Sequence, residues 1–148
     1  MAALAFYKEH PDDDPEELAN TVVSLSACTK EMNTPDFHMY YAQWQLQIRR
    51  DHPSEDILYN GMAYNQYASA CAQPGRHQEA INLAEQGWLI NVTSPEYLAG
   101  KYYPFYAMLY QALSLMALER NEEAAVKLTD AITWRELKYG VDDTRSFQ

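Results

Sequence analysis

The sequence predicts an all-α protein, and three observations lead to that prediction. Apolar residues recur every three or four positions along six segments of the 148-residue chain, and no convincing strand pattern separates them. These segments are bordered by residues that commonly begin or end helices, chiefly proline, glycine, serine, threonine and aspartate. In addition, an Arg-x-x-Glu-Ala pattern at Arg76 recurs 44 residues later at Arg120, a spacing typical of arrays of helical hairpins.

The first three predicted helices each have a recognisable start and end. Asp14 can cap the first, residues 15–32, which opens with proline and two glutamates. The second, residues 34–52, opens with Thr-Pro and ends in basic residues before a His-Pro pair breaks it. The third, residues 54–73, opens with a serine and two acids and ends at a Pro-Gly turn. The short connections predict antiparallel neighbours.

Three further helices complete the pattern. The fourth spans residues 76–92 and the fifth residues 94–119, which begin with a Ser-Pro-Glu start signal. Pro104 lies inside the fifth, where proline removes a backbone donor, so we expect either a kink or a true start near Tyr103. The sixth spans residues 121–139 and stops at a glycine.

The chain divides into three regions. Residues 1–14 form a polar entry segment, residues 15–140 form the helical repeat domain, and residues 141–148 resemble the start of a further, truncated repeat. The last helix carries Trp134 and Leu137, and the tail carries Phe147. Because a terminal repeat normally presents a polar face to water, these apolar residues predict that the end hairpin can join copies of the chain into a homo-oligomer.

The charge balance argues against several classes of partner. With 21 acidic and 11 basic side chains, the formal net charge is −10, which repels nucleic-acid phosphates and anionic lipid. No stretch approaches the roughly 20 apolar residues of a membrane span. We therefore expect a cytoplasmic protein that binds neither nucleic acid nor membrane.

The reactive side chains do not suggest catalysis. Cys28 and Cys71 lie far apart in apolar segments, and we expect both to be free thiols in the core. Four histidines lie in four separate segments: His10, His38, His52 and His77. No phosphate-binding glycine loop, nucleophile motif or metal-ligand spacing accompanies them. We expect no enzyme activity, no catalytic residues, no metal and no cofactor.

The repeat places small residues at matching positions of two hairpins. Ala68 falls opposite Ala112, and Ala80 falls opposite Ala124, so that each predicted hairpin has an alanine on both of its helices. Small side chains at such positions let two helices approach closely. The full set of matching residues is Ala68, Gly75, Arg76, Glu79 and Ala80, then Ala112, Arg120, Glu123, Ala124 and Ala131.

On these residues the sequence resembles the tetratricopeptide (TPR) family, particularly the long-repeat variety found in kinesin light chains and in many fungal multidomain proteins. The resemblance covers residues 15–139 and is weakest in the first hairpin, where Met39 and Gln43 occupy positions that the family usually gives to small or apolar residues. It implies a right-handed array of about three antiparallel hairpins, a TPR-like α-solenoid, whose first helices line a concave groove.

The resemblance also implies a binding site in that groove. Asn65-Gln66 stand where paired asparagines of kinesin-light-chain repeats clasp the main chain of a bound peptide, whereas the third hairpin has Leu109-Tyr110 there. The predicted peptide-binding residues are Met62, Asn65, Gln66, Ser69, Tyr106, Leu109, Tyr110 and Met116, with Leu113 beside them.

Five tyrosines crowd the segment before and within the fifth helix: Tyr97, Tyr102, Tyr103, Tyr106 and Tyr110. Tyrosine and leucine at helical spacing can equally be core, so Tyr110 and Leu113 could pack between hairpins while Tyr106 and Met62 bind a partner. The sequence thus predicts a non-enzymatic scaffold or adaptor that binds a protein or peptide. The alternative is a regulatory or structural assembly domain that packs against its own larger protein or self-associates through its helical ends.

Overall fold

The computed structural model describes residues 14–139, and that part of the chain folds into helices without a strand. The helices are α2 (Pro15–Glu31), α3 (Pro35–Asp51), α4 (Ile57–Ala72), α5 (His77–Asn91), α6 (Pro95–Leu98), α7 (Phe105–Ala117) and α8 (Asn121–Tyr139). The predicted all-α class is confirmed. His10, Phe147 and the tail 141–148 lie outside the described residues.

The one wrong helix prediction concerns residues 94–119. A single long helix was expected there, but the chain forms the single-turn α6, then an irregular stretch, and begins α7 at Phe105. Pro104 is the N-cap residue of α7, a position where its missing N–H costs no helical hydrogen bond. The alternative of a true start near Tyr103 is therefore confirmed.

Helix starts follow the capping signals of the sequence. The Asp14 side chain accepts a hydrogen bond from the backbone N–H of Glu17 at 3.0 Å, and the Asp56 side chain accepts one from Leu58 at 3.1 Å. Each bond satisfies an N–H group that the first turn of a helix leaves without an intrahelical partner. Helix ends follow the sequence signals too. Helix α3 ends at Asp51, and His52, of the His-Pro pair predicted to break it, is the C-cap residue.

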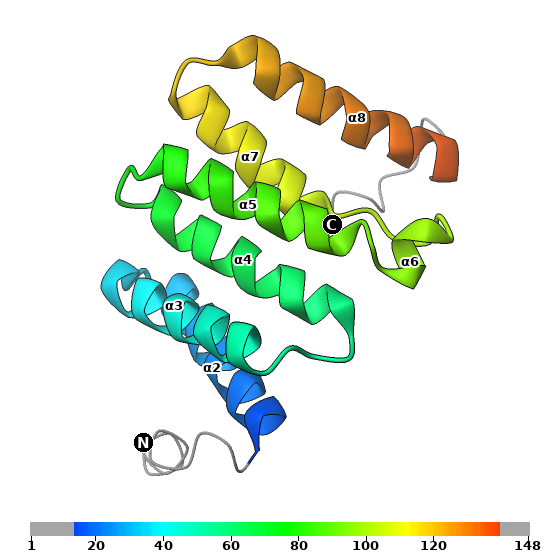
Figure 1. The fold of residues 1–148 in the computed structure, drawn as a ribbon. Coiled ribbons are helices and arrows are strands. Elements are labelled where there is room, and N and C mark those ends of the chain that lie inside the picture. The colour runs from blue at the N-terminus through cyan, green and yellow to red at the C-terminus, as the bar shows by residue number, and fades with distance from the viewer. Residues whose placement is uncertain (1–13, 140–148) are drawn as a thin grey trace.

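Neighbouring helices pack in chain order. α2 packs on α3, α4 on α5 and α7 on α8, and these hairpins are joined by contacts of α3 with α4, of α5 with α7 and of α4 with α7 (Figure 1). The buried apolar residues form three clusters, each centred on one hairpin. No helix in the described part of the chain has the length and apolarity needed to cross a bilayer.

All three hairpins turn in the same way. The residues Asn33, Gly75 and Glu119 have φ angles of 56°, 83° and 61°, and each stands two positions before the next helix begins. The residue after each of them donates its backbone N–H to a carbonyl five positions earlier, which closes the helix end in a Schellman turn. These bonds are Thr34 to Thr29 at 3.0 Å, Arg76 to Cys71 at 3.0 Å and Arg120 to Leu115 at 2.9 Å.

The common turn shows how the hairpins correspond. The helices after the three turns start at Pro35, His77 and Asn121, so the interval is 42 residues for the first repeat and 44 for the second. If the 44-residue interval is applied to the whole sequence, the first hairpin is out of register by two residues. The repeated Arg-x-x-Glu pattern forms the same ion pair twice, between Arg76 and Glu79 and between Arg120 and Glu123.

Each hairpin has one fully buried residue on each helix at matching positions, and in two hairpins both residues are alanine. In two hairpins these are Ala68 with Ala80 and Ala112 with Ala124, all at most 1% exposed. By the corrected register, the first hairpin has Ser26 and His38 at these positions, and both are fully buried. The Ser26 hydroxyl lies 3.1 Å from His38 Nδ1, so a hydrogen bond replaces the alanine contact.

The 42-residue interval also places the neighbouring residues of the first hairpin. His38 matches Ala80, whereas Met39 matches Ile81 and Gln43 matches Glu85. Met39 is half-buried, and the exposed Gln43 side chain donates a hydrogen bond to the Tyr67 hydroxyl at 2.7 Å. The expectation that both cysteines are core residues is half wrong, because Cys71 is buried and Cys28 is exposed.

The buried histidine predicts a pH-dependent stability. Burial lowers the pKa of His38 from its ordinary 6.5, with the nearby Lys30 adding to the effect and the Ser26 carbonyl opposing it. Below about pH 6.5 the unfolded chain therefore binds a proton that the folded chain does not, and the free energy of unfolding falls as the pH falls. We expect urea unfolding between pH 7.5 and 5 to show a smaller loss of stability in His38→Gln than in the wild type. Equal pH slopes would contradict a neutral buried His38.

Candidate functional site

A cavity of about 720 Å³ opens between the C-terminal end of α2, the first half of α4 and the first turns of α7. The segments that bound it are far apart in sequence, because α2 precedes α4 by a whole hairpin and α7 follows it by another. The lining residues are Ala27, Lys30, Glu31, Asp56, Leu58, Tyr59, Met62, Asn65, Gln66, Asn91, Tyr102, Tyr106 and Tyr110.

Five of the residues predicted to bind a peptide line this cavity together: Met62, Asn65, Gln66, Tyr106 and Tyr110. They come from matching positions of two hairpins, because Met62 and Tyr106 are 44 residues apart, as are Gln66 and Tyr110. Helices α4 and α7 thus contribute side chains from matching sequence positions to one surface.

The other predicted residues lie elsewhere. Ser69 is buried, and Leu109 is half-buried against the cluster between α5, α7 and α8. Met116 and Leu113 are exposed on the later turns of α7, outside the lining. Ser69 belongs to α4, and the other three residues belong to α7.

Sequence reasoning missed the contribution of α2 and of the helix ends. Lys30 and Glu31 come from the last turn of α2, Asp56 is the N-cap residue of α4, and Asn91 is the last residue of α5. The repeat pattern could not indicate α2, because the residues of α2 that match Met62 and Gln66 by the 42-residue interval, Asn20 and Ser24, do not line the cavity.

Three residues of the lining have side-chain amide oxygens without hydrogen-bond partners among the described residues. They are Asn65 Oδ1, Gln66 Oε1 and Asn91 Oδ1, and each atom is buried within the described structure. Asn65 is only 6% exposed and Asn91 only 1%. A buried acceptor without a donor costs about 1–3 kcal/mol.

Two glycines make room for the asparagine side chains. A side chain at Gly87 would place its Cβ 2.5 Å from Asn65 Oδ1 and 3.0 Å from the Gly61 carbonyl oxygen. A Cβ at Gly61 would likewise meet the Asn91 side chain. The glycines thus leave room for the asparagines between α4 and α5.

The wall of the cavity is aromatic. Tyr106 and Tyr110 stack with ring centroids 6.2 Å apart, and Tyr106 remains 61% exposed. The Lys30 ammonium donates a hydrogen bond to the Tyr110 hydroxyl at 3.1 Å, which links α2 to α7 across the cavity. Burial raises the pKa of Tyr102, and the nearby Tyr106 adds to that rise, so the Tyr102 hydroxyl is a neutral donor and acceptor at physiological pH.

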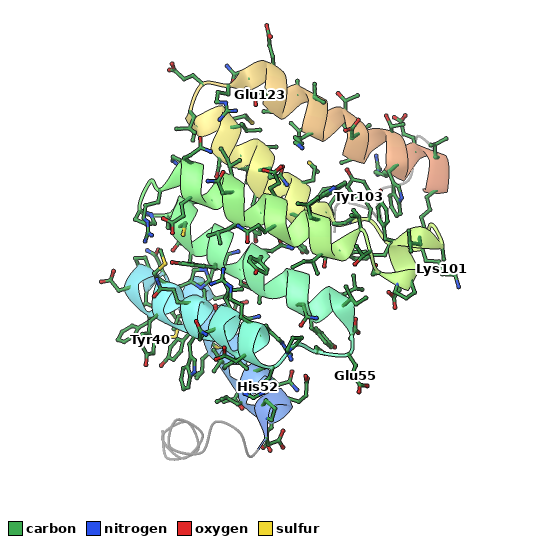
Figure 2. The ribbon with its side chains drawn as sticks, in the orientation of Figure 1. Tyr40, His52, Glu55, Lys101, Tyr103 and Glu123 are labelled. Atoms are coloured by element: carbon green, nitrogen blue, oxygen red, sulfur yellow. The ribbon has the colours of Figure 1, made fainter. Side chains whose placement is uncertain are left out.

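The tyrosine crowd divides between surface and core. Tyr103, labelled in Figure 2, is 8% exposed and lies between α5 and α8. Its ring packs 5.3 Å from Trp88 and 5.3 Å from Trp134. Burial, with Asp130 and Tyr97 nearby, raises the pKa of Tyr103 to about 12. Tyr103 therefore supports the fold, whereas Tyr106 is available to a partner.

Other chemistry is sparse in the described residues. No three His, Cys, Asp or Glu side chains gather there as a metal site would require. Comparison with protein-family models, with curated proteins and with solved structures finds no match to this chain. The functional argument therefore depends on the cavity itself.

The glycine contacts generate a prediction about stability. Gly61→Ala should lower the free energy of unfolding by about 1–3 kcal/mol, because the added methyl group collides with the confined Asn91 side chain. The double variant Gly61→Ala with Asn91→Ala should recover stability, since the three nearest atoms to the new methyl group all belong to Asn91. Chemical denaturation of the single and double variants measures the coupling, and purely additive effects would show that the two residues are not in contact.

Proposed function

We propose that this chain is a TPR-like array of three helical hairpins that binds a segment of another protein in the cavity between α2, α4 and α7. The identical Schellman turns and the matching helix crossings of the three hairpins support the repeat architecture. α4 and α7, the first helices of two successive hairpins, contact each other and share the cavity wall. This is the arrangement that repeat proteins use to build concave binding surfaces.

The observation that carries the proposal is an exposed aromatic side chain in a cavity that is also lined by methionine and glutamine. Tyr106 is 61% exposed and stacks on Tyr110, and Met62 and Gln66 line the same cavity. Protein segments bring both polar groups and apolar side chains, and buried aromatic anchors dominate the affinity of such contacts.

The lining also supports binding over catalysis. Its thirteen residues include no serine, threonine, cysteine or histidine. Its carboxylates are Glu31 and Asp56, and Asp56 accepts the backbone N–H of Leu58 as the N-cap of α4. The lysine of the lining is hydrogen-bonded to Tyr110. A scaffold or adaptor role therefore accounts for these residues better than an enzymatic one.

Truncation of the cavity should abolish partner binding without unfolding the chain. We expect the double variant Tyr106→Ala with Asn65→Ala to lose about tenfold or more in affinity for partners captured from native extract, while its helical circular dichroism is unchanged. Phe37→Ala is a matched control, because Phe37 is 60% exposed on α3 and does not line the cavity. Partners retained equally by all three proteins would contradict the proposal.

A second candidate function is assembly through the last hairpin. On α8, Val126 and Ile132 are exposed and Leu137 is 85% exposed. The outer face of a terminal hairpin is normally polar, so these exposed apolar side chains are unusual. Trp134, by contrast, is half-buried against the neighbouring cluster. Sedimentation at rising concentration separates the two candidates: assembly through α8 produces oligomers that Leu137→Glu disrupts, whereas a groove binder stays monomeric.

A further inference from the structure

The second helices of the first two hairpins use the same face to pack on the hairpin that follows. On α3, Met39 and Leu46 pack in the cluster that contains Ala63 of α4. The corresponding residues of α5, 42 positions later, are Ile81 and Trp88, which pack in the cluster that holds the buried apolar side chains of α7. Residues at this spacing lie on one side of a helix, so this side receives the first helix of the next hairpin.

The corresponding face of α8 is uncovered. The residues of α8 that match Ile81 and Trp88, 44 positions later, are Ala125 and Ile132. Ile81 is 8% exposed, whereas Ala125 is exposed and Ile132 is 43% exposed. The last described helix therefore presents to solvent the face on which the two earlier hairpins are stacked.

The first helices have a matching face that points toward the preceding hairpin. In α4 this face lies beside α3, because the Tyr67 hydroxyl accepts a hydrogen bond from Gln43. In the register that the Schellman turns fix, the face consists of Ala63, Tyr67 and Ala70 in α4, of Ala107, Gln111 and Ser114 in α7, and of Thr21, Leu25 and Cys28 in α2. In α4 and α7 the first and the last of these residues are at most 1% exposed. In α2 the first two are half-buried and Cys28 is exposed, so this helix lacks the cover that a preceding hairpin provides.

The two uncovered faces lie far apart and carry no charge. Helix α2 packs chiefly on α3 and α8 chiefly on α7, and α2 and α8 lie at opposite ends of the molecule (Figure 1). Uncharged faces can be buried without leaving an ion unpaired. The residues of the two faces are Ala125, Thr129 and Ile132 on α8, and Thr21, Leu25 and Cys28 on α2.

We propose that the α8 face of one copy receives the α2 face of a second copy, so that identical chains stack head to tail. The contact repeats between chains the packing of α3 on α4 and of α5 on α7 within one chain. The inference rests on the second candidate function, assembly through the last hairpin, and names the surface on which that hairpin docks. Because the two faces differ, each added copy presents a free face and the stack can continue.

Sedimentation of two blocked variants and of their mixture tests this contact. Ile132→Glu places a charge on the α8 face, and Cys28→Glu places one on the α2 face; both side chains are exposed in the single chain. We expect the wild type to form a series of oligomers as its concentration rises, and each variant to lose about tenfold or more in self-association. An equimolar mixture of the variants should form dimers and nothing larger, because one intact α8 face and one intact α2 face remain.

The solution conditions and a control variant keep the result specific. A reducing agent prevents disulfides of Cys28, and added salt screens the repulsion between copies that each have a formal charge of −10. Val126→Glu is the matched control, because Val126 is 60% exposed on α8 and its counterparts Asn82 and Tyr40 are exposed as well. This variant should associate as the wild type does, and all variants should keep the helical circular dichroism of the wild type.

The possible failures differ in what they contradict. Self-association that Cys28→Glu leaves intact would show that α8 pairs with α8, which overturns the head-to-tail contact but keeps assembly through the last hairpin. Blocked variants that do not combine in the mixture would also overturn the contact. A wild type that stays monomeric at every concentration would contradict both the contact and the second candidate function. The partner-binding proposal is independent of these results, because none of the six residues of the two faces lines the cavity.

Discussion

The close crossing of two helices within each hairpin is the constraint on which the rest of the structure depends. Ala68 and Ala80 are buried in one apolar cluster and Ala112 and Ala124 in another, and their side chains are too small to hold the backbones apart. The Schellman turns that precede α3, α5 and α8 fix the direction from which the second helix returns. Together they make each hairpin a compact unit whose two faces can pack on the next.

The same close approach continues along α4 and α5. Gly61 and Gly87 extend the contact between these helices and let carboxamides fill the remaining space. The Oδ1 atoms of Asn65 and Asn91 are buried there without a hydrogen-bond partner among the described residues. Met62 of α4 and Tyr106 of α7, at matching positions of two hairpins, line one cavity.

Much of the fold could be predicted from sequence, because capping residues and apolar spacing act locally. Asp14, the Thr34-Pro35 start and the late start of α7 after Pro104 are of this kind. The first hairpin could not be aligned with the other two from sequence. Ser26 and His38, which form a hydrogen bond, stand where the other hairpins have alanines, and Asn33 stands at the turn position that is Gly75 in the second hairpin. Five predicted site residues line the cavity, but Lys30, Glu31 and Asn91 reach it only through tertiary packing.

The most direct test of this account compares two adjacent alanines of α8. Ala124 is 1% exposed at the crossing with α7, whereas Ala125 is exposed to solvent. We expect Ala124→Leu to lower the free energy of unfolding by about 1–3 kcal/mol or more, because the larger side chain separates the helices, and Ala125→Leu to change it by less than about 0.5 kcal/mol. Equal stability of the two variants would contradict a close crossing and the architecture built on it.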